Sequence, residues 1–258
     1  MSDAATDTRR YATMIRALAE HAIGLAVDAS AHRPKPGEVR VSLTGLLPAA
    51  RRLLGEAVEL PEPPPVESVE VFTDGRGQSR PVYRSLAAYL YCRAGGPVFS
   101  FNENVGQDVS RRLWSAWHEF ARGGDAAEEV DRIVEANGDC LHPQAFDETP
   151  DHWTYRELVG IHALQSLIEL TGSRDDLSDR PGWRQRLAEI TRYHQFHTQP
   201  DYTTYQPWGL AAFLSNPETV MFGEQQLHDT QSHLQIEGGV GALLPALLLA
   251  DAYASLSA

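Results

Sequence analysis

The chain has 258 residues, of which 42% are hydrophobic and 22% charged, values typical of a globular protein with a substantial core. A chain of this length forms one large domain or two small ones. Its formal net charge of −13 argues against binding to nucleic acid and to anionic membrane surfaces, because both need a basic face.

Features that the sequence lacks indicate its compartment. The two cysteines, Cys92 and Cys140, form no CxxC motif, so neither a disulfide framework nor a thiolate metal site is indicated. The polar segment Met1–Arg10 has no apolar core of the kind found in secretory signals. The apolar run Val240–Ala250 is too short to span a bilayer. We therefore expect a cytoplasmic protein in a reducing environment.

Two helices and a proline-rich segment open the chain. Apolar residues recur at helical spacing over Thr8–Ala29 and again over Leu43–Leu54, which predicts two amphipathic helices. The segment Leu60–Val66 carries four prolines and is typical of a stiff linker.

A small β-hairpin is expected next. Val69 and Val71 alternate with charged residues, and Asp74-Gly75 is a turn signal. We place the hairpin near residues 66–83. These features predict an N-terminal helical segment at 1–60, a linker with the hairpin at 61–82, and a helical domain at 83–258.

From Tyr83 onward, two kinds of helix alternate. One kind is apolar on nearly all faces and must be covered on all sides, whereas the other is amphipathic or mixed and keeps a solvent face. The predicted helices, the first four apolar and the last four amphipathic or mixed, are Tyr83–Arg93, Thr154–Leu170, Tyr205–Leu214, Val240–Leu256, Val105–Arg122, Asp125–Ala136, Trp183–His197 and Val220–Leu234. The alternation predicts an all-α fold of stacked helical hairpins, each with an inner and an outer helix.

A weak internal repeat supports the hairpins. Asp-His-Trp-Thr-Tyr at Asp151–Tyr155 corresponds to Asp-Tyr-Thr-Thr-Tyr at Asp201–Tyr205, and Tyr83 begins a partial earlier copy. This pattern resembles the α/α-toroid folds of terpenoid cyclases, prenyltransferase β-subunits and many carbohydrate-active enzymes. The resemblance implies an α/α-toroid-like array with a central cavity at residues 83–258. The Asp-x-Asp-Asp motif of class II cyclases is absent, so cyclase chemistry is not implied, and the short chain favours a smaller or open toroid.

The segment His194–Leu214 concentrates most of the reactive side chains. His194 and His197 lie three residues apart on one helix, where they can bind a metal or act as acid and base. Alternatively, both are core histidines bonded to backbone carbonyls. His197 lies at the helix end beside Asp201, and we expect this pair to be catalytic.

Further residues at the starts of inner helices are candidates for binding a substrate, because helix capping does not require them. They are Tyr83, His152, Tyr155, Tyr202, Gln206 and Trp208. Thr154 and Glu157 match a capping box, which accounts for both without a functional role. His142 has no recognisable partner and is expected in a loop or on the surface.

Three functions remain open. The first is an enzyme that acts on a small, partly apolar or polyhydroxylated molecule, with proton transfer by His197 and Asp201. The second is a non-catalytic ligand-binding or scaffold protein. The third is an HD-type phosphohydrolase with metal ligands from His194 or His197, His228-Asp229 and Asp251. The sequence identifies neither a cofactor nor a complete set of metal ligands, and it does not indicate the oligomeric state.

Overall fold

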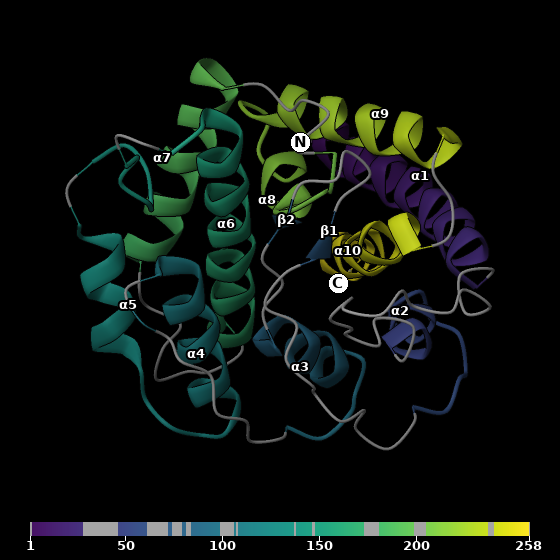
Figure 1. The fold of residues 1–258 in the computed structure, drawn as a ribbon, viewed down its shortest axis with the longest axis horizontal. Coiled ribbons are helices and arrows are strands. Elements are labelled where there is room, and N and C mark those ends of the chain that lie inside the picture. Colours follow the sequence, from purple (N-terminus) through teal and green to yellow (C-terminus); the bar gives the residue numbers. More distant parts are fainter. Residues whose placement is uncertain are drawn as a thin grey trace. The chain divides into compact units, whose positions relative to one another are not determined.

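Helices dominate the protein. The computed structural model describes residues 2–27, 46–60, 72–73, 79–80, 84–98, 106, 108–136, 138–145, 148–172, 181–198, 205–236 and 240–257. Within these residues lie ten α-helices and one short pair of strands (Figure 1). The predicted all-α class is confirmed. Among the described helices, none has the length and apolar character needed to cross a membrane.

The chain forms two compact units. Unit 1 comprises Met1–Glu103, Tyr205–Pro207 and Leu227–Ala258, and unit 2 comprises Asn104–Thr204 and Trp208–Gln226. Helix α9 (Val220–Ile236) contributes to both units. The domain boundaries expected at residues 60 and 82 stay a prediction.

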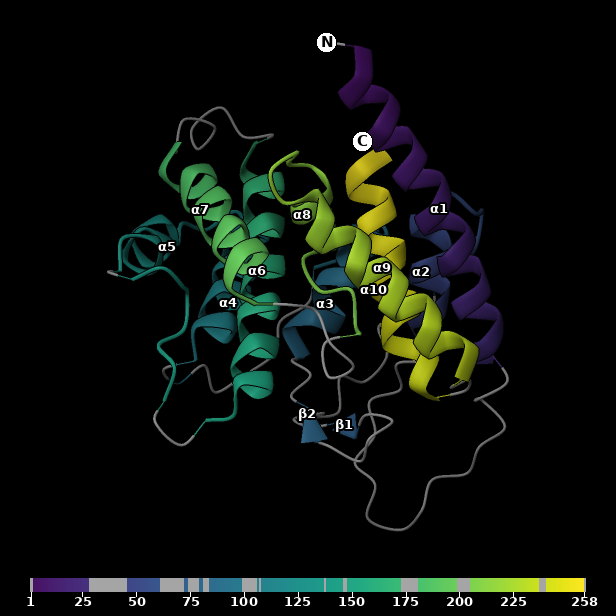
Figure 2. The same ribbon diagram turned by 90° about the horizontal axis from the view of Figure 1, so that it is seen from above.

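Unit 1 is built around its C-terminal helix. Helix α10 (Val240–Ser257) is apolar on all faces, and it packs against α1 (Ser2–Val27) and α2 (Leu47–Leu53) (Figures 1 and 2). Such a helix is stable in water only when its neighbours cover it. This requirement explains why the two ends of the chain lie side by side within unit 1.

A buried acid joins α10 to helix α3 (Arg84–Arg93). The Tyr89 hydroxyl donates to the carboxylate of Asp251 at 2.9 Å, and Arg93 Nε lies 3.0 Å from Asp251 Oδ1. Asp251 is buried. Its charge is tolerated because it is both paired and hydrogen-bonded.

The strands lie in the segment where a hairpin was expected. Phe72–Thr73 (β1) pairs antiparallel with Ser79–Arg80 (β2), with Phe72 opposite Arg80. The turn signal Asp74-Gly75 lies outside the described residues. The predicted hairpin is therefore not confirmed beyond these two residue pairs.

Unit 2 is built around helix α6 (Pro150–Gly172), which is buried along most of its length. It packs against α4 (Val109–Ala121), α7 (Pro181–His197) and α8 (Leu210–Leu214), and α5 (Ala127–Val134) contacts α4 and α7. Burial follows the predicted alternation in both units, since α3, α6, α8 and α10 are largely covered, whereas α4 and α7 keep exposed faces.

Several helices begin at residues other than those predicted. Helix α6 begins at Pro150, a residue favoured in the first helical turn, so Thr154 lies inside the helix and the capping-box interpretation is wrong. Helix α8 begins at Leu210 and not at Tyr205, because Gly209 adopts a left-handed conformation (φ +63°). Helix α4 begins after Asp108, whose side chain caps it.

The contact between α3 and α10 gives a stability prediction. Asp251→Ala removes the partner of both Tyr89 and Arg93, and we expect the free energy of unfolding to fall by about 3 kcal/mol. Tyr89→Phe removes one hydrogen bond to a charged group and should cost about 1–2 kcal/mol. Urea unfolding followed by circular dichroism measures both. The control is Glu20→Gln in an exposed ion pair, which should cost less than about 0.5 kcal/mol. A loss for Asp251→Ala no larger than that of the control would contradict the prediction.

Candidate functional site

A buried polar site of unit 2 is centred on Glu157, a fully buried residue of α6. Its Oε1 accepts hydrogen bonds from the backbone N–H of His142 and from His142 Nδ1, the latter at 2.9 Å. Its Oε2 accepts from the Leu141 N–H at 3.0 Å and lies 3.4 Å from His194 Nε2. Four N–H groups therefore surround one carboxylate.

A hydroxyl group lies on the far side of each histidine. His142 Nε2 is 3.2 Å from Ser110 Oγ, and His194 Nδ1 is 2.9 Å from Thr198 Oγ1. The result is a chain of five side chains in the order hydroxyl, imidazole, carboxylate, imidazole, hydroxyl. We call Ser110, His142, Glu157, His194 and Thr198 the Glu157 cluster.

A glycine on α6 makes room for the segment that carries His142. A β-carbon at residue 160 would lie 2.8 Å from Leu141 Cδ1 and 3.2 Å from His142 Cε1. Trp153 holds the same segment, since its Nε1–H donates to the His142 carbonyl at 2.9 Å. A side chain at residue 160 would therefore force Leu141 and His142 to shift from the positions in which they reach Glu157.

Glu157 is ionised at neutral pH. Burial by itself would raise the pKa of its carboxyl group. The hydrogen bonds from His142 and His194, together with the charge that these rings can carry, outweigh burial and lower the pKa to about 2. The cluster therefore holds a negative charge inside the protein.

Ser110, His142 and Glu157 have the order of a nucleophile, a base and an orienting acid. However, Ser110 is completely buried, and its hydroxyl lies 3.1 Å from the Arg156 carbonyl, to which it can only donate. The oxygen is thus enclosed by protein. This geometry favours a role in positioning residues 138–142 over nucleophilic attack on a substrate.

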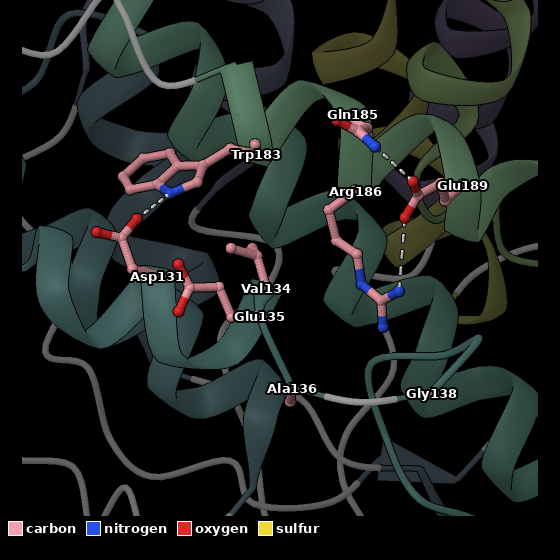
Figure 3. Close-up of a pocket in the computed structure, with 10 residues that line it drawn as sticks. Asp131, Val134, Glu135, Ala136, Gly138, Trp183, Gln185, Arg186 and Glu189 are labelled. Carbon is pink, nitrogen blue, oxygen red and sulfur yellow. Dashed lines mark hydrogen bonds and ion pairs between the residues drawn. The ribbon is translucent and has the colours of Figure 1, made fainter.

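A groove along the outer face of α7 in unit 2 is formed by two pockets, and Figure 3 shows the residues that line one of them. It consists of a cavity of about 510 Å³ and an adjoining one of about 300 Å³, and both are lined by Arg186 and Glu189. We call them together the α7 groove. Its other lining residues are Asp131, Val134, Glu135, Ala136, Gly138, Asp139, Gly182, Trp183, Gln185, Arg192, Tyr193, Phe196 and His197.

Contacts within the α7 groove hold several of its polar groups in place. Trp183 Nε1 donates to Asp131 Oδ1 at 2.7 Å, and Gln185 donates to Glu189 at 2.9 Å (Figure 3). Arg186 donates to the carbonyl of Cys140 at 3.0 Å. Through Arg186, the wall of the groove is connected to the segment that the Glu157 cluster holds.

His197 lies at one end of the groove and is exposed. Its Nδ1 is 3.0 Å from the Tyr193 carbonyl, and its ring stacks on that of Tyr193 with 4.4 Å between the centroids. A carbonyl oxygen can only accept, so Nδ1 carries the hydrogen. Neutral His197 therefore has its free electron pair on Nε2.

Cys140, beside the groove, is a poor nucleophile. Burial raises the pKa of its thiol to about 12, and the negative charge of Glu157 acts in the same direction. A thiol with this pKa remains protonated at neutral pH, whereas reactive cysteines are thiolates.

The described members of the predicted site lie in different surroundings. His197 lines the α7 groove, and His152 pairs with Glu148 at 2.8 Å. Tyr155 and Trp208 are buried, with their rings edge to face at 6.0 Å. Gln206 is buried and belongs to unit 1. The remaining candidates, Tyr83, Asp201 and Tyr202, lie outside the described residues, so the pairing of His197 with Asp201 stays a prediction.

The sequence did not single out the centre of the cluster. The capping-box interpretation accounted for Glu157 without a functional role. His142, which was expected in a loop or on the surface, is buried. His194 does lie in the core, but among the described residues the partners of its ring are Glu157 and Thr198 and not a backbone carbonyl. A signal was nevertheless present, since Glu157 lies on a helix that was expected to be covered on most faces, where a carboxylate needs a buried partner.

The residues considered as metal ligands lie in different surroundings. Asp251 pairs with Arg93 in unit 1, whereas the side chain of His228 is 72% exposed. In the part of the chain that the structure describes, no three His, Cys, Asp or Glu residues are grouped in a way that could hold a metal ion.

Comparison with protein-family models, with curated proteins and with solved structures finds no match for this chain.

The buried charge predicts the response to acid. The pKa of Glu157 in the folded protein lies below its ordinary value of 4.5, so ionised Glu157 stabilises the fold above about pH 4.5. This stability is lost as the pH falls towards 2. From the size of the shift, we expect a loss on the order of 3 kcal/mol.

Urea unfolding at pH 7, 5, 4 and 3 measures this effect. Glu157→Gln should be less stable than the wild type at pH 7, because the amide group of glutamine places an N–H donor where four N–H donors already point. The stability of this variant should also depend less on pH. Glu128→Gln, at a side chain that is 88% exposed, is the matched control. Equal pH profiles for wild type and Glu157→Gln would refute the assignment.

Proposed function

We propose that this protein binds a small molecule in the α7 groove. The observation that carries the proposal is the connection between the groove and the Glu157 cluster, which fixes residues 138–142 beside α7. Binding sites are typically concave, preformed and equipped with a few held polar groups. The α7 groove has these properties, since Asp131, Arg186 and Glu189 are already held by hydrogen bonds or ion pairs.

The side chains of the groove favour a ligand with polar and apolar parts. Four carboxylates and two guanidinium groups line the groove, and they suit hydroxyl or amino groups. Tyr193 and Phe196 offer rings at one end, and the Phe196 side chain is largely exposed. The ligand class proposed is therefore a small, partly apolar or polyhydroxylated molecule.

A second candidate function, catalysis, rests on His197. The hydrogen bond from Nδ1 to the Tyr193 carbonyl leaves Nε2 as a proton acceptor at the end of the groove. In this proposal His197 transfers a proton to or from the bound molecule, and Asp201 is its partner. The protein is then an enzyme that uses histidine acid–base chemistry.

The arrangement of hairpins as an α/α-toroid-like array also stays a proposal. Its support is the alternation of covered helices with helices that keep an exposed face. The central cavity expected for such an array also stays a proposal, and one residue of its expected lining, His197, lines the α7 groove. The expected lining residues are Tyr83, His152, Tyr155, His197, Asp201, Tyr202, Gln206 and Trp208.

Blocking the groove tests the binding proposal. Gly182 lines the groove, and a β-carbon added there meets no atom within 4 Å, so Gly182→Trp fills space without disturbing the core. We expect it to raise the Kd of groove ligands at least about tenfold, which corresponds to 1.4 kcal/mol. Ligand-observed NMR with a panel of monosaccharides, polyols and aromatic fragments identifies ligands and measures their affinity.

Gly24→Trp on α1 is the control, because a β-carbon at residue 24 also meets nothing within 4 Å. Ligands should bind this variant as they bind wild type. Equal binding to both tryptophan variants would place the ligands elsewhere and refute the proposal.

Catalysis makes a separate prediction. His197→Ala should change the free energy of unfolding by less than about 0.5 kcal/mol, because the side chain is exposed. If the ligand found in the screen is also a substrate, its turnover should fall by about 10²–10⁴-fold, the usual contribution of a general acid or base. Mass spectrometry of ligand incubated with wild type and variant measures turnover. Turnover that persists in His197→Ala would reject the residue as the base.

A further inference from the structure

The surroundings of Glu157 accept only the ionised form of its carboxyl group. An ionised carboxylate has roughly four positions for donors, and the N–H groups of Leu141, His142 (backbone and Nδ1) and His194 occupy them. A protonated carboxyl would need an acceptor in place of one of these donors. Protons that enter the cluster therefore go to the imidazole rings.

The two hydroxyl groups allow each ring to gain a proton in place. Ser110 Oγ reaches both His142 Nε2 and the Arg156 carbonyl, and Thr198 Oγ1 reaches both His194 Nδ1 and the carbonyl of His194. A hydroxyl donates to a neutral ring, or it turns to the carbonyl and accepts from a protonated ring. Only the hydroxyl hydrogen has to move.

Charge limits how many protons the cluster can hold. With Glu157 ionised, one protonated ring gives a net charge of zero, whereas two give a buried positive charge. Among the described residues, Glu157 is the one carboxylate that contacts the two rings. Asp139, whose charge acts on Cys140 and Tyr193, lies in the lining of the α7 groove, and no hydrogen bond or ion pair is found between it and either ring among the described residues. Cys140 and Tyr193, which face Glu157 from the 138–142 segment and from α7, have raised pKa values and are neutral. Arg186 adds a positive charge near Cys140, and the Ser110 hydroxyl faces the cluster from α4.

We propose that the Glu157 cluster is a proton-operated clamp on residues 138–142, which holds this segment against α6 and α7 with at most one ring protonated and releases it when both are. An uncompensated buried charge is strongly unfavourable, so the second proton favours an open segment in which water reaches the rings. Glu157 is thus a positioning residue for the α7 groove, which Gly138 and Asp139 line. The clamp does not depend on the groove binding a ligand.

Two cysteines report on the clamp in the intact chain. Cys140 lies in the clamped segment and Cys92 in unit 1, and both are half-buried with raised pKa values. The probe is 4,4′-dithiodipyridine, and mass spectrometry of the two peptides gives the ratio of their reaction rates between pH 8 and pH 5. The ratio removes the pH dependence that both thiols share.

In wild type we expect the Cys140/Cys92 ratio to be constant near neutral pH and to rise on acidification. The rise should approach tenfold per pH unit, the limit for release by a single proton. In His194→Asn the rise should disappear above pH 5, because Glu157 compensates the one remaining imidazole. His228→Asn, at a histidine whose side chain is 72% exposed, is the control and should keep the wild-type profile.

Glu157→Gln should give a high ratio at every pH, because the clamp lacks its charge. If this variant unfolds completely, Cys92 also reacts faster. The proposal is then tested by comparing the ratio in the wild type with the ratio in His194→Asn. The proposal is overturned if the Cys140/Cys92 ratio of the wild type does not change with pH. It is also overturned if the ratio of His194→Asn rises on acidification as it does in the wild type. Either result leaves binding in the groove to be judged by the Gly182→Trp experiment.

Discussion

The ionised carboxylate of Glu157, enclosed by four N–H donors, is the interaction on which the arrangement of unit 2 depends. Apolar packing brings α4, α6 and α7 together, but the hydrophobic effect has no direction and does not select one position for residues 138–142. Hydrogen bonds to a buried charge do select one position, because each unmade bond leaves a desolvated group. Gly160 permits this position, since any side chain there would meet Leu141.

Helix α7 connects the cluster with the candidate binding site. Its inner face carries His194, which reaches Glu157, whereas its outer face carries Arg186, Glu189 and His197, which line the groove. The same helix therefore contributes to the buried charge and to the surface where a ligand would bind. In the proposed clamp, a change in the protonation of the cluster alters the groove through residues 138–142, which line or adjoin both.

The helices could be predicted from the sequence, and their ends less well. Hydrophobic periodicity placed α4 and α7, and nearly continuous apolar runs placed α6 and α10, because both signals are local in the chain. The start of α6 was misjudged because Thr154 and Glu157 have the spacing of a capping box, and nothing local showed that the helix already begins at Pro150. The start of α8 depended on the backbone conformation of Gly209, which the sequence permits but does not require.

What the sequence determined by itself is the class of the fold and the division of its helices into covered and half-exposed ones. It also placed His197 in a polar region at the end of a helix. The tertiary structure alone decided that Glu157 meets His142 and His194, which lie 15 and 37 positions away in the chain. The reason is physical: a helix face is a local property of the chain, whereas the partner of a buried charge is whichever group the folded chain brings within hydrogen-bonding distance.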